Sequence, residues 1–315
     1  MTCFRHRRGW LAALLLLPLA ALTIGGAGAP ALGAPARENG TSLSTSDKRV
    51  RPNERVTVRG RFRPLTTTAA PGSGAIAPAD ASVRIQFRAL GAEHWQDARS
   101  TRAGRGGRFS ERLRIERSGR IRAVGAGGRT TAAKLVRVRS VTYARVAKRV
   151  RVGRKVAIRG RVAPAGTRRR ITVEAGGDRL RARTHRNGRF AVRWKPRHAG
   201  HHRVRVRAAG NLVAAASAAR AGRVAVFRPA EASWYGPGLY GNGTACGGRL
   251  EPSTIGVAHK SMRCGTKLTI RYHGRQVKAR VIDRGPYIPG REFDLTEAVK
   301  NRLGMGGVGT ILVDR

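Results

Sequence analysis

Two residues near the C-terminus have the types and spacing to carry acid–base chemistry. Asp283 follows the alternating apolar run 277–281, which has the period of a strand with one buried face. A carboxylate at the inward end of such a face tends to have a raised pKa and suits a general acid. His259 ends a similar run, 255–257. We expect Asp283 to donate a proton and His259 to orient or assist it.

Both residues also have a structural interpretation. Asp283 is followed by a Gly-Pro turn, so it can cap that turn and pair with Arg284 or Arg291. His259 can be a hydrogen-bonded residue of the domain core. The sequence leaves both interpretations open.

A second carboxylate, Asp294, stands three positions before Glu297. That spacing is a helix-capping signature, and Gly304 further on is a common helix end. We therefore expect a short helix that stops at Gly304, with Asp294 in a structural role.

Several side chains of the same region are candidates for binding a sugar. Aromatic rings offer a flat apolar face with a polar edge, which suits stacking on sugars, although core packing explains them equally well. The candidates for substrate binding are Trp234, Tyr235, Tyr240, Arg284 and Tyr287.

The chain begins with the features of a secretory signal peptide, residues 1–36. A basic stretch, 5–8, precedes the apolar run from Leu11 to Ile24, and small residues follow. The run is shorter than the roughly 20 residues that cross a membrane, so no transmembrane anchor is expected after its removal. Secretion to the cell wall or extracytoplasmic space follows.

Export bears on the three cysteines. Cys3 leaves with the signal, and Cys246 and Cys264 remain. A pair in an exported protein favours a disulfide, with free thiols as the alternative. No metal site and no cofactor are expected, since two cysteines lack the usual ligand partners.

The net charge is +47, carried mostly by arginines that alternate with apolar residues. An intracellular chain of this kind would suggest nucleic acid. An exported chain meets anionic wall polymers instead, and no specific nucleic-acid partner is expected. A solvated strand face is the other interpretation of these arginines.

An internal repeat fills the middle of the chain. The stretch from Val50, VRPNERVTVRGRFRP, is similar to the stretch from Val150, VRVGRKVAIRGRVAP, and alternating strands follow each. Short strands separated by glycine turns predict two Ig-like β-sandwiches, residues 41–139 and 141–228. A Pro/Ala/Gly/Thr insertion from Thr66 is expected to form a surface loop, and a linker is expected around Pro229.

Ordered motifs run through the remaining segment, residues 231–315. They are Ala232-Ser233-Trp234-Tyr235-Gly236, Thr244-Ala245, Val257-Ala258-His259, Cys264-Gly265-Thr266, Asp283-Arg284-Gly285-Pro286 and Phe293-Asp294-Leu295-Thr296. Together they resemble the rare lipoprotein A (RlpA) family. The resemblance implies a six-stranded double-psi β-barrel and lytic transglycosylase activity on the glycan strands of peptidoglycan, giving anhydro-ended products. The fold class expected for the whole chain is therefore all-β, with two Ig-like sandwiches followed by this barrel.

One position departs from the family. RlpA-like transglycosylases carry a catalytic Glu after the segment that here reads Thr244-Ala245-Cys246-Gly247, and this chain has Gly248. The family's His and later Asp correspond to His259 and Asp283. The departure leaves a second hypothesis open, a noncatalytic wall-binding or expansin-like wall-loosening module. In a third, the Ig-like repeats are adhesive and the barrel is an anchor.

Overall fold

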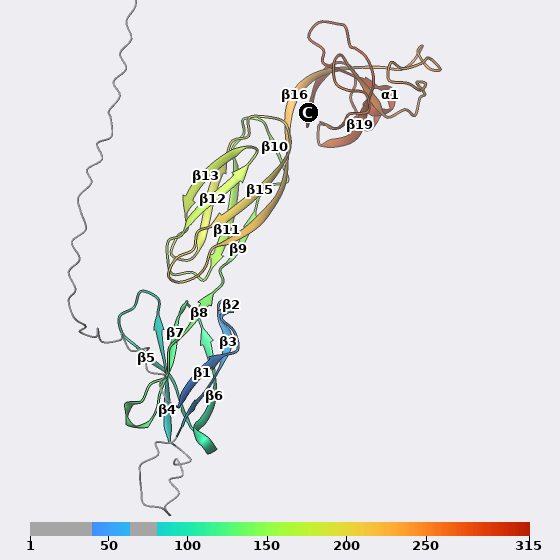
Figure 1. The fold of residues 1–315 in the computed structure, drawn as a ribbon. Helices are drawn as coiled ribbons and strands as arrows, with labels where there is room; N and C mark the ends of the chain where they lie inside the picture. The colour runs from blue at the N-terminus through green and yellow to red at the C-terminus, as the bar shows by residue number, and fades with distance from the viewer. Residues whose placement is uncertain (1–39, 64–80) are drawn as a thin grey trace, which may run out of the picture. The chain divides into compact units, whose positions relative to one another are not determined.

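The computed structural model describes residues 40–63 and 81–315. The predicted signal peptide and the insertion from Thr66 lie outside these residues. Most of the described elements are strands, and the all-β class is confirmed (Figure 1). Within the described part of the chain, no helix is long and apolar enough to span a membrane.

The first repeat forms two sheets, in the strand orders β1-β3-β6 and β2-β8-β7-β4-β5. The strands are β1 (Thr41–Thr45), β2 (Arg49–Val50), β3 (Glu54–Phe62), β4 (Ser82–Ala89), β5 (Gln96–Arg102), β6 (Arg108–Ile115), β7 (Gly119–Val124) and β8 (Lys134–Val138). Two short 3₁₀ turns are η1 (Arg105–Gly107) and η2 (Ala126–Gly128). Alternate residues such as Val56, Val58 and Ile85 are buried in one core, as the period of two predicts.

The second repeat has the same plan. Its strands are β9 (Val141–Arg145), β10 (Arg149–Arg151), β11 (Val156–Ala163), β12 (Arg170–Ala175), β13 (Asp178–Arg183), β14 (Arg189–Trp194), β15 (Gly200–Ala208) and β16 (Ser217–Tyr235). One sheet has the order β14-β11-β9, and the other contains β13-β12-β15-β16 with β10 beside β16. Trp194, Ile158 and Ile171 are fully buried between them.

The C-terminal segment closes into a barrel of strands in the order β16-β20-β17-β19-β18-β21, with β21 paired back to β16. The new elements are β17 (Gly256–His259), β18 (Lys267–Tyr272), β19 (Arg275–Asp283), β20 (Phe293–Thr296), α1 (Glu297–Leu303) and β21 (Gly309–Val313). Phe293, Leu295 and Ile311 are completely buried in its core. The predicted six-stranded barrel is confirmed.

The predicted linker around Pro229 is wrong. Pro229 lies inside β16, where it is in register with Leu312 of β21. The N-terminal part of β16 pairs with β15, and its C-terminal part pairs with β20 and β21. One continuous strand therefore belongs to the sheets of both the second sandwich and the barrel.

Candidate active site

Two carboxylates lie on either side of Ala258 in the barrel sheet. Ala258 of β17 is in register with Asp283 of β19 and with Asp294 of β20. Asp294 is in turn in register with Ser233 of β16. Since register partners project to the same face of a sheet, the four residues form one row. Only the small side chain of Ala258 stands between the two carboxylates in this row.

A β-bulge places Asp283 in this row. The register between β17 and β19 shifts after Val257, so that Asp283 rather than Ile282 lies opposite Ala258. The uninterrupted alternation predicted for this strand is therefore wrong, because the bulge moves Asp283 away from the position beside His259. Bulges near active sites re-aim side chains in this way.

Asp283 is held by backbone hydrogen bonds. Its Oδ1 accepts the N–H of Arg284 at 2.8 Å and the N–H of Ala245 at 2.9 Å. The bond from Arg284 is that of a turn cap, as one interpretation of the sequence expected. The bond from Ala245 joins a separate loop to the end of β19. No salt bridge joins Asp283 to Arg284 or Arg291 in the described residues.

Asp294 is the carboxylate whose surroundings favour the acid form. Its Oδ1 is buried and has no hydrogen-bond partner among the described residues. Burial raises the pKa of Asp294, and the negative charge of Asp283 acts in the same direction, while the Ser233 hydroxyl and Arg291 oppose them. A carboxyl with a raised pKa holds its proton to a higher pH, which suits proton donation.

The capping role expected of Asp294 is wrong. The N-cap of α1 is Thr296, and Glu297 is the first residue of the helix. Asp294 lies in β20, between the buried residues Phe293 and Leu295. The helix ends at Gly304, as predicted.

Tyr235 completes the carboxylate cluster. It lies two residues after Ser233 on β16, so both side chains project to the same face. Its hydroxyl is buried and has no hydrogen-bond partner among the described residues. Burial raises the pKa of Tyr235, and the charges of Asp283 and Asp294 raise it further. The hydroxyl therefore keeps its proton beside the two carboxylates.

His259 is fixed by the loop that follows it. Its Nδ1 accepts the backbone N–H of Ser261 at 3.1 Å and of Met262 at 3.0 Å. Nδ1 therefore carries no proton, and the proton is on Nε2, which lies 3.5 Å from Oε1 of Glu292. Arg228 binds Glu292 and is the main reason that the pKa of Glu292 is lowered. Adjacent strand residues face opposite sides, so His259 is on the other face of β17 from Ala258.

Arg284 joins three parts of the domain. Its Nη1 donates to the carbonyl oxygens of Met262 at 2.9 Å and His259 at 3.3 Å, and its Nη2 lies 3.2 Å from Sγ of Cys264. These contacts occupy the guanidinium of Arg284, a residue that the sequence suggests for substrate binding. They give Arg284 a bracing role beside the cluster.

The remaining aromatic candidates lie in different surroundings. Trp234 packs against the barrel core, with Nζ of Lys300 3.9 Å from its ring centroid. The Tyr240 hydroxyl donates to Glu297. Tyr287 follows the Gly-Pro turn, and 78% of it is exposed. Of the three, Tyr287 has the ring face most available for stacking.

The predicted disulfide is confirmed. Cys246 and Cys264 are bonded, with their Cα atoms 5.5 Å apart. The backbone N–H of Cys246 also donates to the carbonyl of Ile282 at 3.1 Å. The disulfide therefore fixes the loop whose Ala245 N–H binds Asp283.

The backbone at Gly248 adopts a conformation that favours glycine. Gly247 and Gly248 have φ angles of 89° and 87°, in the left-handed region that residues with a Cβ rarely adopt. A Glu at position 248 would be strained there. Glu251, the next carboxylate along the chain, is exposed, and its backbone N–H is bound to Thr254. Neither position supplies a third acid to the cluster.

Sequence comparison places the barrel among known proteins. Residues 230–314 match the model of a family described as "Lytic transglycolase". A "Probable endolytic peptidoglycan transglycosylase RlpA" of Synechocystis is 39% identical over 87 residues, which are 26% of this chain and 27% of that protein. A protein of the same description from Aquifex aeolicus is 42% identical over 82 residues, 25% of this chain and 36% of the relative.

Campylobacter jejuni has an "Endolytic peptidoglycan transglycosylase RlpA" that is 38% identical over 81 residues, 25% of this chain and 30% of that protein. The chain thus spans about a third of the length of the curated relatives it matches, all through the barrel. The C-terminal domain of this chain, residues 230–314, is a member of the RlpA-like double-psi β-barrel family.

Proposed function

We propose that the barrel is a lytic transglycosylase that cleaves the glycan strands of peptidoglycan and leaves anhydro-ended products. The single observation that carries the proposal is the pair of carboxylates, Asp283 and Asp294, on either side of Ala258. The names of the curated relatives give the substrate class. The pair supplies the proton transfers that such a reaction requires.

In the proposed reaction Asp294 donates its proton to the glycosidic oxygen as the bond from that oxygen to the sugar C1 breaks. Its raised pKa makes it the better donor, a role that the sequence had suggested for Asp283. A hydroxyl of the same sugar attacks C1, closes the anhydro ring and gives its proton to Asp283. No water is consumed, and proton exchange with solvent restores both carboxyls.

The other residues position the substrate and the carboxylates. Tyr235 donates a hydrogen bond to the sugar beside the cluster, and Tyr287 stacks on a ring further along the strand. His259 acts through the loop that it anchors at Ser261 and Met262, not as a base, because its Nδ1 is already engaged.

Export to the cell wall is part of the proposal. It rests on the basic, apolar and small residues of the predicted signal peptide, 1–36, and on a disulfide in the mature chain. The wall is where a glycan-cleaving enzyme meets its substrate.

A noncatalytic wall-binding or wall-loosening module is the second candidate, and Gly248 favours it because the family Glu is missing. Digestion of purified sacculi with the barrel distinguishes the two candidate functions. A lytic transglycosylase releases soluble anhydro-ended fragments that mass spectrometry identifies. A binder sediments with the sacculi and releases none, and that result would overturn the enzymatic proposal.

A further inference from the structure

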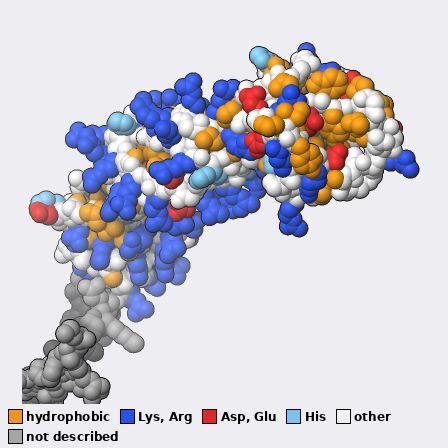
Figure 2. All heavy atoms as spheres, turned by 90° about the horizontal axis from the view of Figure 1, so that it is seen from above, with side chains coloured by type: hydrophobic (Ala, Val, Ile, Leu, Met, Phe, Trp, Pro, Cys, Tyr) orange, Lys and Arg blue, Asp and Glu red, His pale blue; other side chains and the backbone are white. Residues whose placement is uncertain are grey.

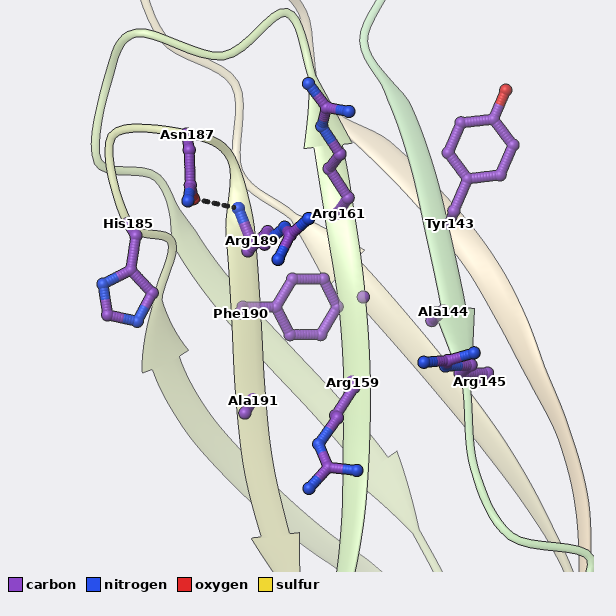
Figure 3. A pocket seen from close by; sticks show the side chains of 11 residues that line it. Tyr143, Ala144, Arg145, Arg159, Arg161, His185, Asn187, Arg189, Phe190 and Ala191 are labelled. Carbon is purple, nitrogen blue, oxygen red and sulfur yellow. Dashed lines mark hydrogen bonds between the residues drawn. The ribbon is translucent and has the colours of Figure 1, made fainter.

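An arginine-lined groove runs over the β14-β11-β9 sheet of the second sandwich. It is open and has a volume of about 730 Å³. Figure 3 shows its basic side chains on three neighbouring strands, Arg145 on β9, Arg159 and Arg161 on β11, and Arg189 on β14. All four are exposed. The carboxylate cluster of the barrel does not contribute to this groove.

The arginines are opposed to one another across the strands. Arg159 is in register with Arg145, and Arg161 is in register with Arg189. Like charges directly opposite each other in a sheet are destabilising. The sheet therefore carries two repulsive pairs side by side, a cost that a bound anion would offset.

No carboxylate of the second sandwich compensates these charges. Residues 141–228 contain only two acidic side chains, Glu174 and Asp178. Glu174 pairs with Arg179, and Asp178 accepts a hydrogen bond from Nε1 of Trp194 at 2.9 Å. None of the salt bridges in the described residues involves an arginine of the groove. Lys and Arg also cover much of the surface drawn in Figure 2, although hydrophobic and uncharged atoms prevail at its right-hand end.

Polar groups and open space complete the groove. Tyr143, which is 67% exposed, stands on the β9 side, and His185 and Asn187 lie in the turn before β14. Asn187 accepts the backbone N–H of Arg189 at 3.0 Å, which fixes that turn. In β14 the register partner of Arg159 is Ala191, whose short side chain leaves room beside the guanidinium.

We propose that this groove binds a phosphodiester-linked anionic polymer of the cell wall. The guanidinium fork matches phosphate oxygens bidentately, and each phosphodiester keeps its charge at every physiological pH. Arg159 and Arg161 are two residues apart on one strand, about 6.7 Å, so they address successive charges of one chain. The Tyr143 hydroxyl and the Asn187 amide suit the hydroxyl groups between phosphates.

The inference rests on the export proposed above but not on the transglycosylase activity. It gives the second sandwich a task of its own, holding the chain at an anionic wall while the barrel meets the glycan. Because binding and cleavage are measured separately, a failure of one leaves the other standing.

The test compares two double variants of the mature chain, residues 37–315. Arg159→Gln with Arg161→Gln removes two charges from β11, the central strand of its sheet. The control, Arg181→Gln with Arg183→Gln, removes two exposed charges at the same spacing from β13, in the opposite sheet. There Arg181 is in register with Thr172 rather than with another arginine. Melting temperatures verify that both variants are folded.

The probe is poly(glycerol phosphate) of uniform length, titrated by calorimetry across a salt series. The β11 variant is expected to lose affinity about tenfold or more, and its salt slope to fall by about two, as for two lost phosphate contacts. The β13 control is expected to stay close to the unaltered chain. Equal losses in both variants, or undiminished binding by the β11 variant, would overturn the assignment.

Single-stranded DNA with the same number of phosphates is the competing ligand. The proposal predicts that it binds more weakly than poly(glycerol phosphate) and with similar affinity for both variants. If DNA binds as tightly and depends on Arg159 and Arg161 in the same way, the groove is a general nucleic-acid site and the wall-polymer assignment is refuted.

Discussion

Asp283 and Asp294 share one register partner, Ala258, although they belong to strands that do not pair with each other. The β-bulge at Ile282 creates this relationship, because an unbroken register would place Asp283 opposite His259. The charge of each carboxylate therefore acts on the other across a single small residue. The electrostatic coupling between them is open to measurement.

Asp283→Asn is expected to lower the pKa of Asp294. The negative charge of Asp283 is one cause of the raised pKa, so its removal makes ionisation of Asp294 easier. An NMR titration of the carboxyl carbons in labelled protein measures this. Glu251→Gln, which removes one exposed charge from the same domain, is the control and should leave the titration of Asp294 unchanged. A titration of Asp294 unmoved by Asp283→Asn would show that the two groups are not coupled.

Asp294→Asn is expected to make the barrel more stable at neutral pH. A group whose pKa is raised in the folded state contributes stability below its unfolded pKa, and that contribution is lost as pH rises through the folded pKa. At neutral pH the native Asp294 therefore lowers the stability of the fold. The uncharged amide of Asn in its place does not. Thermal unfolding of the isolated barrel should give a gain in Tm that shrinks as pH falls toward 4. A gain in Tm of the same size at all pH values would contradict this account.

Replacement of His259 should act mainly on the fold. His259→Ala leaves the N–H groups of Ser261 and Met262 without their acceptor and opens space beside Phe293, whose ring centroid is 4.9 Å from that of His259. A loss of about 2–3 kcal/mol is expected. Urea unfolding measures it against His94→Ala, a change at an exposed surface position. A stability equal to that of the control would mean that His259 is not an anchor.

The family Glu cannot be restored by a simple substitution. Gly248→Glu should destabilise the barrel by about 1–2 kcal/mol, because φ at this position is 87°. Gly306→Glu is the matched control, since Gly306 is exposed and outside the left-handed region. Urea unfolding compares the two, and transglycosylase assays of the Gly248 variant are expected to show no gain. Increased product release by Gly248→Glu would instead indicate that the natural barrel lacks its acid.

Much of the fold follows from the sequence, because strands with one buried face alternate with a period of two. Val56 and Val58 in the first sandwich illustrate this, as does the barrel core at Val281. The Cys246–Cys264 disulfide follows from the cysteine count in a chain expected to be exported. These features depend on composition and local pattern alone.

The site was harder to predict because it depends on register. The residues around Ile282 carry no sequence signal for a bulge, and a register without the bulge places Asp283 opposite His259. The spacing of Asp294 to Glu297 predicts a helix cap, yet the residues on either side of Asp294 are both buried, which is the pattern of a strand. The alternation of the apolar residues Phe293 and Leu295 with Asp294 is the sequence signal that indicates strand β20. The shared strand at Pro229 was also missed, because proline usually marks a break in a strand.

The most direct test of the central claim is mass spectrometry of the soluble products from purified sacculi treated with the unaltered barrel and with Asp294→Asn. The account predicts anhydro-ended fragments from the unaltered barrel. It predicts a loss of about 10²–10⁴-fold in their release by Asp294→Asn, with sacculus binding retained. Undiminished release by the variant, or no anhydro-ended product from the unaltered barrel, would contradict the account.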